Sequence, residues 1–531
     1  MTGKYVLKEL SRYQVGTFAD IIYRNALLYP DYEAFVHEDR RISFFDYNQR
    51  VNCLVNGLQD LGLSKGDVVG ILSWNCLECA EVVGAAMKGG FIASPYNPRL
   101  TQEELQYIID YSQAKIVFCG LEFLDMIPVL QNAVSRFNTA VSIDNTDKDY
   151  PTYTYLLEEY QSTEPVPEVT REDPVLILYT GGTTGTPRGA LFSHQVKMEN
   201  SKIKALQLGL EFRDRNLVVL PMFHTAQDSH MWPFFLTGGC NVIMPKGTFD
   251  PHATIKIIQE ENITDTHIVP TQLIAILNDP DIENFDLGNT KRIYYASAPM
   301  PTEVLKRGLS IFGPVFMQGF GQTETGPQIA GLKREDHKIF DKTQEEQKVL
   351  ASVGQPDIGT HIRIVNFNGD DLAQGEIGEI IVQSEKNMLG YWNKPEETAG
   401  VIQDGWLYTG DLGYYDAKGY IYLADRKKDM IITGGENVYP KEVENVLYRH
   451  PAVAEVAVIG IPDDYWGERV HAVIILNRGR QATEKEIIDF CKQHIASYKA
   501  PKSIDFVDSL PMSPQGKILK RELRKMYIEQ D

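Results

Sequence analysis

The segment from Tyr179 to Gly189 has the composition of a loop that binds a ligand through its backbone. Its sequence is YTGGTTGTPRG, and it follows the apolar stretch Val175–Leu178. Glycines let backbone N–H groups approach a ligand, and threonine hydroxyls with one arginine add further donors. This donor set suits a polyphosphate, and an exposed loop between strands is the alternative. The Lys-Ser or Lys-Thr pair of the common mononucleotide phosphate loop is missing, which disfavours a kinase or a motor ATPase.

Two acidic residues lie where a nucleotide could use them. Glu324 follows the apolar stretch Val315–Met317, and ligands sit at the carboxyl ends of parallel strands. Glu324 could hold Mg²⁺ against phosphate oxygens, or it could be a carboxylate that starts a helix. Asp411 lies between two glycines, where it could accept the hydroxyls of a ribose or form an Asx-type turn.

Four further positions leave a structural and a functional interpretation open. The charged run Asp425–Asp429 is either a solvated turn or a hinge. The paired glycines Gly434 and Gly435 either lead into a helix or allow close approach to a ligand. Lys517 is either an exposed lysine or a cation on a mobile element that neutralises a reacting phosphate. His224, which follows a strand, either caps the next element or lines a ligand pocket.

Composition limits the classes of function open to this chain of 531 residues. The length predicts two to four domains. The net charge of −20 repels nucleic acid and anionic membranes, so neither is an expected partner. The sequence has no apolar run that suits a signal peptide or a membrane span, and a cytoplasmic location is expected. Cys76 and Cys79 lack the further ligands of a metal site, and six cysteines do not make a disulfide framework.

The order of apolar stretches predicts an α/β fold. Between residues 68 and 329, short strands alternate with helix-length segments, a pattern typical of parallel sheets covered on both faces. Residues 352–425 predict a small antiparallel β unit, and a compact α+β segment begins after residue 427. The expected strands include Val68–Leu72, Lys115–Phe118, Val175–Leu178, Leu217–Leu220, Asn241–Met244, Thr266–Val269, Arg292–Tyr295 and Val315–Met317, and the expected helices include Leu77–Met87, Lys441–Arg449 and Glu484–His494.

Taken in order, five of these motifs resemble the adenylate-forming superfamily of acyl-CoA synthetases, luciferases and peptide-synthetase adenylation domains. The five are Tyr179–Gly189, Phe320–Glu324, the Thr-Gly-Asp that ends at Asp411, Arg426–Pro440 and Pro511–Lys517. The resemblance covers nearly the whole chain. It implies a large N-terminal adenylation domain, residues 1–427, made of two stacked α/β subdomains and a small β-barrel-like unit. A small, mobile α+β domain would follow at residues 428–531, with its hinge at Lys428.

The resemblance also implies roles for individual residues. Lys517, Glu324 and Thr323 would be catalytic, and Glu324 would hold Mg²⁺. ATP and AMP would contact Thr180, Gly181, Gly182, Thr183, Thr184, Gly185, Thr186, Pro187, Arg188, Ser297, Ala298, Pro299, Gly319, Phe320, Gly321, Asp411 and Arg426. CoA would contact Gly434, Gly435, Trp466, Tyr498 and Lys502, and the acyl group would lie near His224, Gln227 and Asp228.

Three residues depart from the usual motifs of that superfamily. Gly182 replaces a frequent serine and so removes one hydrogen-bond donor. Arg188 replaces a frequent lysine, which keeps the charge and changes its geometry. Phe320 replaces the usual tyrosine, which preserves stacking and loses a hydroxyl. Each departure could lower the affinity for ATP, and none removes the chemistry.

The reaction expected from this resemblance is the ATP-dependent conversion of a carboxylic acid to acyl-AMP, followed by transfer to CoA. The expected acid is a medium- or long-chain fatty acid. An aryl or alicyclic acid is the alternative, because Thr225, Gln227, Asp228 and Ser229 make one pocket wall polar. Loading of a separate carrier protein is a further alternative, as is nucleotide sensing without turnover, although sensing would not require Lys517. The expected partners are the small molecules themselves, and a homodimer is left open.

Overall fold

The computed structural model describes residues 6–144, 149–166, 168–180, 187–247, 249–297, 300–338, 340, 343, 347–434, 436–463, 465–512 and 518–528. They form two compact units. The first unit comprises Met1–His361 and Val382–Leu407, and the second comprises Ile362–Ile381 and Tyr408–Asp531. The domain boundary expected after residue 427 stays a prediction.

The first unit contains a nine-stranded sheet whose inner strands are parallel. Strand order is β15-β14-β13-β12-β11-β9-β10-β1-β2, with parallel pairing from β13 through to β1 and antiparallel pairing at both edges. The bounds are β1 (Glu33–His37), β2 (Arg40–Ser43), β9 (Arg215–Val218), β10 (Cys240–Ile243), β11 (Asp265–Ile268), β12 (Arg292–Tyr295), β13 (Phe316–Phe320), β14 (Ala330–Leu332) and β15 (Gln355–Pro356). The edges depart from the all-parallel expectation, because short return strands close the sheet there.

A seven-stranded sheet in the same unit has the order β18-β8-β7-β4-β3-β5-β6. Its bounds are β3 (Val68–Leu72), β4 (Ile92–Pro95), β5 (Ala114–Cys119), β6 (Thr139–Ser142), β7 (Pro174–Thr180), β8 (Arg188–Ser193) and β18 (Gly390–Tyr391). Strands β7 and β8 pair antiparallel, so the glycine-rich segment joins the two strands of a hairpin. A strand followed directly by a helix, as in the common phosphate loop, is not the arrangement here.

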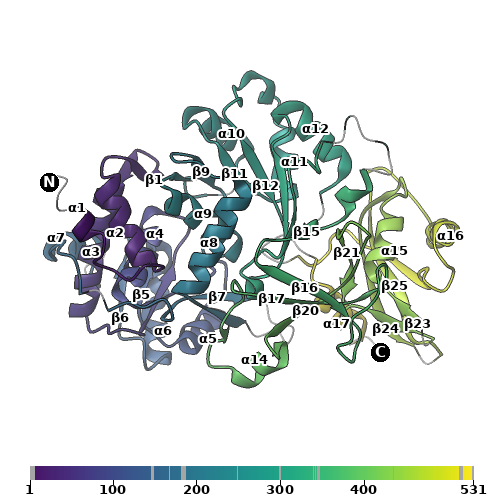
Figure 1. The fold of residues 1–531 in the computed structure, drawn as a ribbon. Helices are drawn as coiled ribbons and strands as arrows, with labels where there is room; N and C mark the ends of the chain where they lie inside the picture. Colours follow the sequence, from purple (N-terminus) through teal and green to yellow (C-terminus); the bar gives the residue numbers. More distant parts are fainter. Residues whose placement is uncertain are drawn as a thin grey trace. The chain divides into compact units, whose positions relative to one another are not determined.

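Helices fill the space between and around these sheets (Figure 1). One continuous apolar cluster includes Val69 and Leu178 of the seven-stranded sheet, Val218 and Ile243 of the nine-stranded sheet, and Trp232 of α9. The two sheets therefore share a core. The helices are α1 (Val6–Glu9), α2 (Phe18–Leu28), α3 (Phe44–Asp60), α4 (Leu77–Gly89), α5 (Gln102–Ser112), α6 (Ile127–Ala133), α7 (Tyr153–Glu159), α8 (His194–Leu208), α9 (Thr225–Thr237), α10 (Pro251–Glu260), α11 (Pro270–Leu277), α12 (Thr302–Phe312) and α14 (Pro395–Val401), with 3₁₀ turns η1 (Leu121–Met126), η2 (Ile282–Asn284), η3 (Thr323–Thr325) and η4 (Lys348–Ala351).

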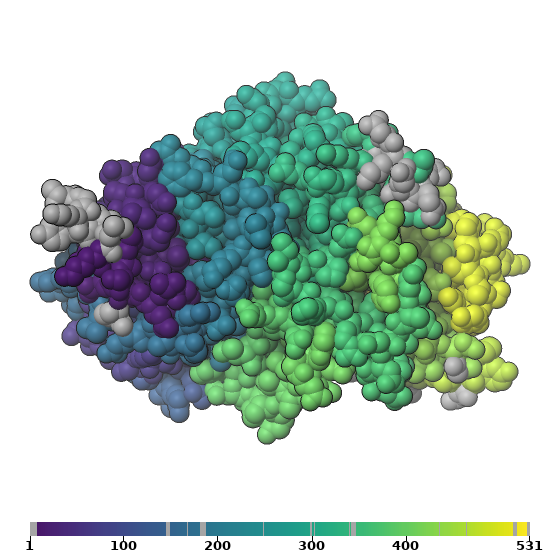
Figure 2. Space-filling view, in the orientation of Figure 1, coloured from purple at the N-terminus to yellow at the C-terminus, as the bar shows by residue number. Residues whose placement is uncertain are grey.

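Helix α2 illustrates how local sequence sets these elements. Thr17 caps it, because its side-chain oxygen accepts a hydrogen bond from the backbone N–H of Asp20. The side chain of Asn25, fully buried on this helix, donates to the carbonyl of Phe235 at 2.7 Å. In the space-filling view the N-terminal residues, in purple, lie against blue residues of the same unit (Figure 2). Across the described part of the chain, every helix is too short or too polar to cross a membrane.

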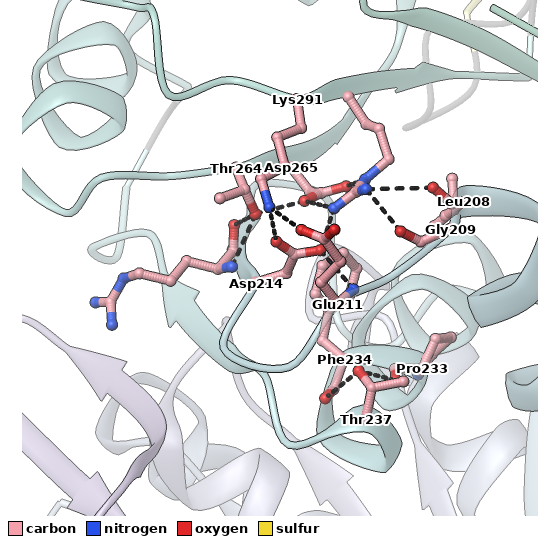
Figure 3. Close-up of polar contacts among 12 residues, drawn as sticks. Leu208, Gly209, Glu211, Asp214, Pro233, Phe234, Thr237, Thr264, Asp265 and Lys291 are labelled. Carbon is pink, nitrogen blue, oxygen red and sulfur yellow. Dashed lines mark hydrogen bonds and ion pairs between the residues drawn. The ribbon is translucent and has the colours of Figure 1, made fainter.

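A buried cluster of charges fixes the starts of β11 and β12. The guanidinium of Arg292 bonds to the carboxylates of Asp265 and Asp214 and donates to the carbonyl of Gly209 at 3.0 Å. Lys291 adds a bond of 2.8 Å to Asp214 (Figure 3). Removing one partner from such a cluster would leave a buried charge uncompensated, so the cluster holds the two strands in register.

A five-stranded sheet has the order β16-β17-β20-β19, with β21 paired to β20. Its bounds are β16 (Thr360–Val365), β17 (Gly378–Ser384), β19 (Ile402–Gln403), β20 (Trp406–Tyr415) and β21 (Ile421–Arg426). The second unit continues with a sheet of order β23-β22-β25-β24, and β26 pairs with β25. These elements are β22 (Ile431–Thr433), β23 (Glu436–Val438), α15 (Pro440–Leu447), β24 (Val453–Asp463), β25 (Gly467–Leu476), α16 (Glu484–His494), β26 (Ser503–Phe506) and α17 (Lys520–Ile528).

The predicted α/β class, with a larger N-terminal and a smaller C-terminal part, is confirmed. The strands expected at Val68–Leu72 and Arg292–Tyr295 and the helix at Glu484–His494 have those bounds in the structure. The other expected strands and helices overlap those observed. Strand β8 was missed, because its start lies in the motif Thr186-Pro187-Arg188-Gly189 that predicts only a loop.

Candidate active site

The two ends of the glycine-rich segment lie side by side. Thr180 ends β7 and Arg188 begins β8, and the two residues face each other across the hairpin. Pro187 lies directly before Arg188. The predicted phosphate contacts Gly181, Gly182, Thr183, Thr184, Gly185 and Thr186 lie outside the described residues. The hairpin therefore fixes where a loop of this sequence leaves and rejoins the sheet.

Arg188 is held by two side chains that follow far along the chain. Its Nε lies 2.5 Å from Oε2 of Glu397 on α14. Its guanidinium also lies over the ring of Tyr391, 5.3 Å from the ring centroid. Tyr391 belongs to β18, which pairs with β8 at Ala190. The cation is thus directed by a strand and a helix that flank it.

Glu324 lies in the 3₁₀ turn η3, which packs against β7. The hydroxyl of Tyr391 donates to Oε1 of Glu324 at 2.9 Å, and the backbone N–H of Met388 donates to the Glu324 carbonyl at 2.8 Å. Burial, together with the Glu324 charge, raises the pKa of the Tyr391 phenol. The phenol therefore stays protonated and donates. Thr323, next to Glu324, is buried.

Tyr391 consequently joins two predicted site residues that are distant in sequence. Its ring contacts the Arg188 cation, while its hydroxyl holds the Glu324 carboxylate. Sequence reasoning missed Tyr391. The Gly390-Tyr391-Trp392 segment was the available signal, although nothing in its spacing relates it to Arg188 or Glu324.

Further predicted ATP and AMP contacts lie at or just after the ends of β12 and β13. Gly319 and Phe320 end β13, and Phe320 is half-buried. At Gly321 the backbone has φ +159°, and a Cβ would overlap the carbonyl of Pro327, so no side chain fits. Ser297 follows β12 and has φ +74°, a left-handed conformation that is rare for a residue with a side chain and is often found at ligand sites. Ala298 and Pro299 lie outside the described residues.

The three residues expected near the acyl group have different surroundings. His224 caps α9, and its Nδ1 accepts from the backbone N–H of Ala226 at 3.2 Å. Gln227 is fully buried, and its Oε1 accepts from the backbone N–H of Leu220 at 3.0 Å. Asp228 lines a cavity, as described next. The structure therefore brings Asp228, rather than Gln227, to the wall of a cavity.

The cavity at Asp228 has a free volume of about 20 Å³, which is room for about one water molecule. Asp228 forms an ion pair with Lys197 of α8 at 2.6 Å, and Nε1 of Trp232 donates to it at 2.9 Å. Burial lowers the pKa of Lys197, and the Asp228 charge opposes that shift. The cavity is lined by Leu176, Leu178, Phe192, Lys197, Asn200, Ser201, Thr225, Asp228, Ser229, Gly326 and Pro327.

In the second unit, Asp411 lies within strand β20 rather than in a turn. It faces Arg426 of β21, and Nε of Arg426 lies 2.6 Å from Oδ1 of Asp411. Gly410, with φ +71°, precedes it and donates its N–H to Oε1 of Glu379 at 3.1 Å. Asp411, the predicted ribose acceptor, and Arg426 thus form an ion pair, with Asp411 buried and Arg426 more exposed.

The predicted hinge residue Lys428 is exposed in the turn between β21 and β22. Its neighbour Lys427 pairs with Glu379 at 2.7 Å, and its other neighbour Asp429 pairs with Arg524 of α17 at 2.9 Å. Lys517 lies outside the described residues, although α17 begins three residues after it. The turn is therefore tied on both sides, while Lys428 faces solvent.

Three of the predicted CoA contacts lie together in the second unit. Gly434 has φ +59°, donates to the carbonyl of Trp466 at 2.7 Å, and would place a Cβ 2.9 Å from the indole. Nζ of Lys502 lies 5.5 Å from the Trp466 ring centroid. Tyr498 is exposed and its ring lies under Lys499. Gly435 lies outside the described residues.

Comparison with known proteins places the chain in a family. The model of the AMP-binding enzyme family matches residues 22–392, and that of its C-terminal domain matches residues 442–517. The chain is 33% identical over 505 residues to a feruloyl-CoA synthase of Amycolatopsis sp, covering 95% of this chain and 98% of that one. It is 33% identical over 544 residues to a long-chain-fatty-acid–CoA ligase of Bacillus subtilis strain 168, covering 97% and 95%.

A solved structure is similar over the same length. The anthranilate CoA ligase AuaEII in complex with anthranoyl-AMP has a TM-score of 0.85 and 28% identity, and the match covers 98% of this chain and 99% of that one. The chain therefore belongs to the AMP-binding enzyme family, within the adenylate-forming superfamily that its motifs resemble. The predicted class, an acid–thiol ligase of the AMP-forming acyl-CoA synthetase type, is confirmed by these relatives.

Proposed function

We propose that this enzyme uses ATP to convert a carboxylic acid to acyl-AMP and then transfers the acyl group to CoA. The observation that carries the proposal is the linkage of Arg188, Tyr391 and Glu324 at the edge of the seven-stranded sheet. That linkage sets a cation and a carboxylate beside the two ends of a glycine- and threonine-rich loop. Such a set suits a triphosphate that must be held and then cleaved.

The carboxylate of Glu324 fits the role of a Mg²⁺ ligand. Mg²⁺ takes one or two carboxylates in addition to phosphate oxygens and water, and it would neutralise charge on the departing pyrophosphate. Tyr391 would orient this carboxylate by donating to Oε1, which leaves negative charge available on the group. Thr180 and Arg188 would hold the β- and γ-phosphates, and Thr323 the α-phosphate.

The residues of the second unit would serve the ribose and the thiol. Asp411 would accept the ribose hydroxyls while its ion pair with Arg426 holds it in place. Lys517 would stabilise the charge that gathers on the α-phosphate as the carboxylate attacks. After rotation of residues 428–531 about Lys428, Gly434, Trp466 and Lys502 would present CoA, whose thiolate attacks the acyl carbon and displaces AMP.

Two classes of acid are candidates. A medium- or long-chain fatty acid is supported by the similarity to a long-chain-fatty-acid–CoA ligase. An aryl or alicyclic acid is supported by the similarity to a feruloyl-CoA synthase and by the polar cavity at Lys197, Asn200 and Asp228. Because a long alkyl chain gains little from such a wall, the cavity favours the second class.

Pyrophosphate and thioester formation, measured separately on a panel of fatty, aryl and alicyclic acids, test the proposal. We expect acid-dependent release of pyrophosphate from ATP, and AMP with acyl-CoA when CoA is added. Release of pyrophosphate without thioester would instead indicate an enzyme that loads a carrier protein. No release with any acid would contradict the proposal and favour a nucleotide sensor.

A further inference from the structure

Helix α8 turns an unusual polar face toward the interior of the first unit. Lys197, Asn200, Ser201, Lys204 and Gln207 occupy positions i, i+3, i+4, i+7 and i+10, which lie on one side of a helix. All five line cavities. An inward helix face is normally apolar, because burying unpaired polar groups costs free energy.

The face lines two adjoining cavities. The first, at the Lys197–Asp228 pair, has been described. The second, with a free volume of about 10 Å³, is lined by Asn200, Ile203, Lys204, Gln207, Ser229, Pro327, Gln328, Asp357 and Lys386. Asn200, Ser229 and Pro327 belong to both linings. Gly326, two residues after Glu324, lines only the first cavity, whereas Gln328 lines only the second.

Lys204 is buried at the second cavity without a carboxylate of its own. Its Nζ donates to Oε1 of Gln328 at 2.7 Å and lies 3.1 Å from the ring centroid of Tyr294, whose hydroxyl donates to the same Gln328 oxygen at 2.6 Å. Lys204 forms no ion pair with any residue in the described part of the chain. By contrast, Lys197 on the same face forms an ion pair with Asp228.

A protonated Lys204 would lack a balancing carboxylate. Lys386 is buried and pairs with Asp357 at 2.9 Å, and Nε2 of Gln328 donates to Asp357 at 3.1 Å. Two lysines thus share one carboxylate. Burial lowers the pKa of Lys204 well below its ordinary range, with Lys386 adding to that shift and Asp357 opposing it. An anion placed beside Lys204 would favour the protonated amine and make the charges equal.

A second observation points to the same place. His230 is 1% exposed, and neither of its ring nitrogens has a hydrogen-bond partner among the described residues. Its ring lies 5.6 Å from that of Tyr294 and 5.2 Å from that of His267. Buried polar groups are nearly always paired, so an unpaired imidazole next to an unbalanced lysine marks a region that is completed by something else.

We propose that the acid pocket is built for a dicarboxylic acid, with one carboxylate activated by ATP and the other held by Lys204 at the second cavity. This assignment rests on the proposed function, since it names the substrate class of the same site. Gln328 and Tyr294 position the Lys204 amine, and the Lys386–Asp357 pair keeps Gln328 in place. The free volume in this structure is small, so Lys204 and Gln328 separate when the second carboxylate enters.

The test compares matched acids in the assay for AMP formation that depends on acid and CoA. The pairs are straight-chain monoacids and diacids of four to ten carbons, and benzoate with the three benzenedicarboxylates. We expect wild-type kcat/KM to favour the diacid by at least about tenfold in one or more pairs, because a site built for a polar group rejects analogues that lack it. Equal or higher kcat/KM for the monoacid in every pair would overturn the assignment.

The variant K204M then locates the effect. It should lower the diacid-to-monoacid ratio of kcat/KM by at least about tenfold and leave the monoacid rate within about threefold. K202M is the matched control, because Lys202 is two residues away on the exposed side of α8, pairs with Glu199, and should leave the ratio unchanged. A melting temperature that falls while the ratio stays constant would show a structural lysine and contradict the assignment.

These outcomes test the diacid assignment separately from the acyl-CoA ligase activity. If no acid yields AMP, the proposed function fails. If monoacids are converted and diacids are not, the enzyme is still an acyl-CoA ligase and the second carboxylate site does not exist. Because the wild-type panel alone can give this result, the test does not depend on the folding of K204M.

Discussion

At the scale of single residues, Tyr391 has the clearest predicted effect. Changing it to phenylalanine keeps the ring under Arg188 and removes the hydrogen bond of 2.9 Å to Glu324. We expect kcat for acid-dependent pyrophosphate release to fall by about tenfold, because a hydrogen bond to a charged group contributes about 1.5–3 kcal/mol. The melting temperature should change little, since the strand pairing of β18 is backbone-based.

Y107F is the matched control for Y391F. Tyr107 is partly exposed on α5, and its ring stacks on that of Tyr111. It should retain the wild-type rate. A Y391F enzyme with unchanged kcat at saturating Mg²⁺ and ATP would mean that the orientation of Glu324 does not matter for the first half-reaction.

His194 gives the folded protein a predicted sensitivity to acid. Its Nδ1 accepts from the backbone N–H of Phe18 at 3.3 Å, and burial lowers its pKa from 6.5 to about 3. As pH falls below 6.5, the unfolded chain therefore binds a proton that the folded chain does not bind until about pH 3. Stability contributed by the neutral ring is lost across this window, by about 1.4 kcal/mol for each pH unit.

Urea titrations between pH 6 and about pH 4 measure this effect. The variant H194N keeps an acceptor and removes the titrating ring, so its free energy of unfolding should fall less steeply with decreasing pH than that of the wild type. H252N, at an exposed histidine, is the control. Identical slopes for H194N and the wild type would show that His194 is protonated in the folded protein over this range.

At the scale of elements, the loop at Gly434 should serve the second half-reaction. Alanine at this position would keep an unfavourable positive φ and bring its Cβ within 2.9 Å of Trp466. We expect G434A to slow thioester formation by about tenfold or more while acid-dependent pyrophosphate release stays near the wild-type rate. The two products, pyrophosphate and acyl-CoA, are measured in the same reaction.

Gly479 offers a matched control for the backbone strain. It has φ +77° in the same unit, and a Cβ there would meet nothing within 4 Å. G479A should therefore carry the strain without the contact, and should form acyl-CoA at the wild-type rate. If G434A impairs both half-reactions equally, the loop is structural and does not act on CoA in particular.

Element by element, the sequence predicted the regular parts well and the connections between them poorly. Buried strands such as β3 and β12 are recognisable because most of their residues are aliphatic, β-branched or aromatic. The partnership of Arg188, Glu324 and Tyr391 was beyond such reasoning, since it depends on β18 pairing with β8 across about two hundred residues of chain. The polar face of α8 was missed for a different reason, because its lysines resemble those of a solvated helix.

At the scale of the whole molecule, the sequence order of the motifs carried more information than their individual composition. Glu324 and Asp411 each had an ordinary structural explanation, and the ordered set identified the superfamily that the family match confirms. The identity of the acid substrate is a finer property than membership of the family. The feruloyl-CoA synthase and the long-chain-fatty-acid–CoA ligase are equally identical to this chain, and their names give different acids. Only the acid pocket of this chain can therefore distinguish the two kinds of substrate.

We expect one lysine of the C-terminal domain, Lys517, to serve the first half-reaction and to be absent from the second. Lys517 to alanine tests it, with K525A as a control at an exposed lysine of the neighbouring helix α17. We expect K517A to lose acid-dependent pyrophosphate release by about a hundredfold or more, yet to convert preformed acyl-AMP and CoA to acyl-CoA at close to the wild-type rate. Wild-type rates of pyrophosphate release by K517A, or equal loss of both half-reactions, would contradict it.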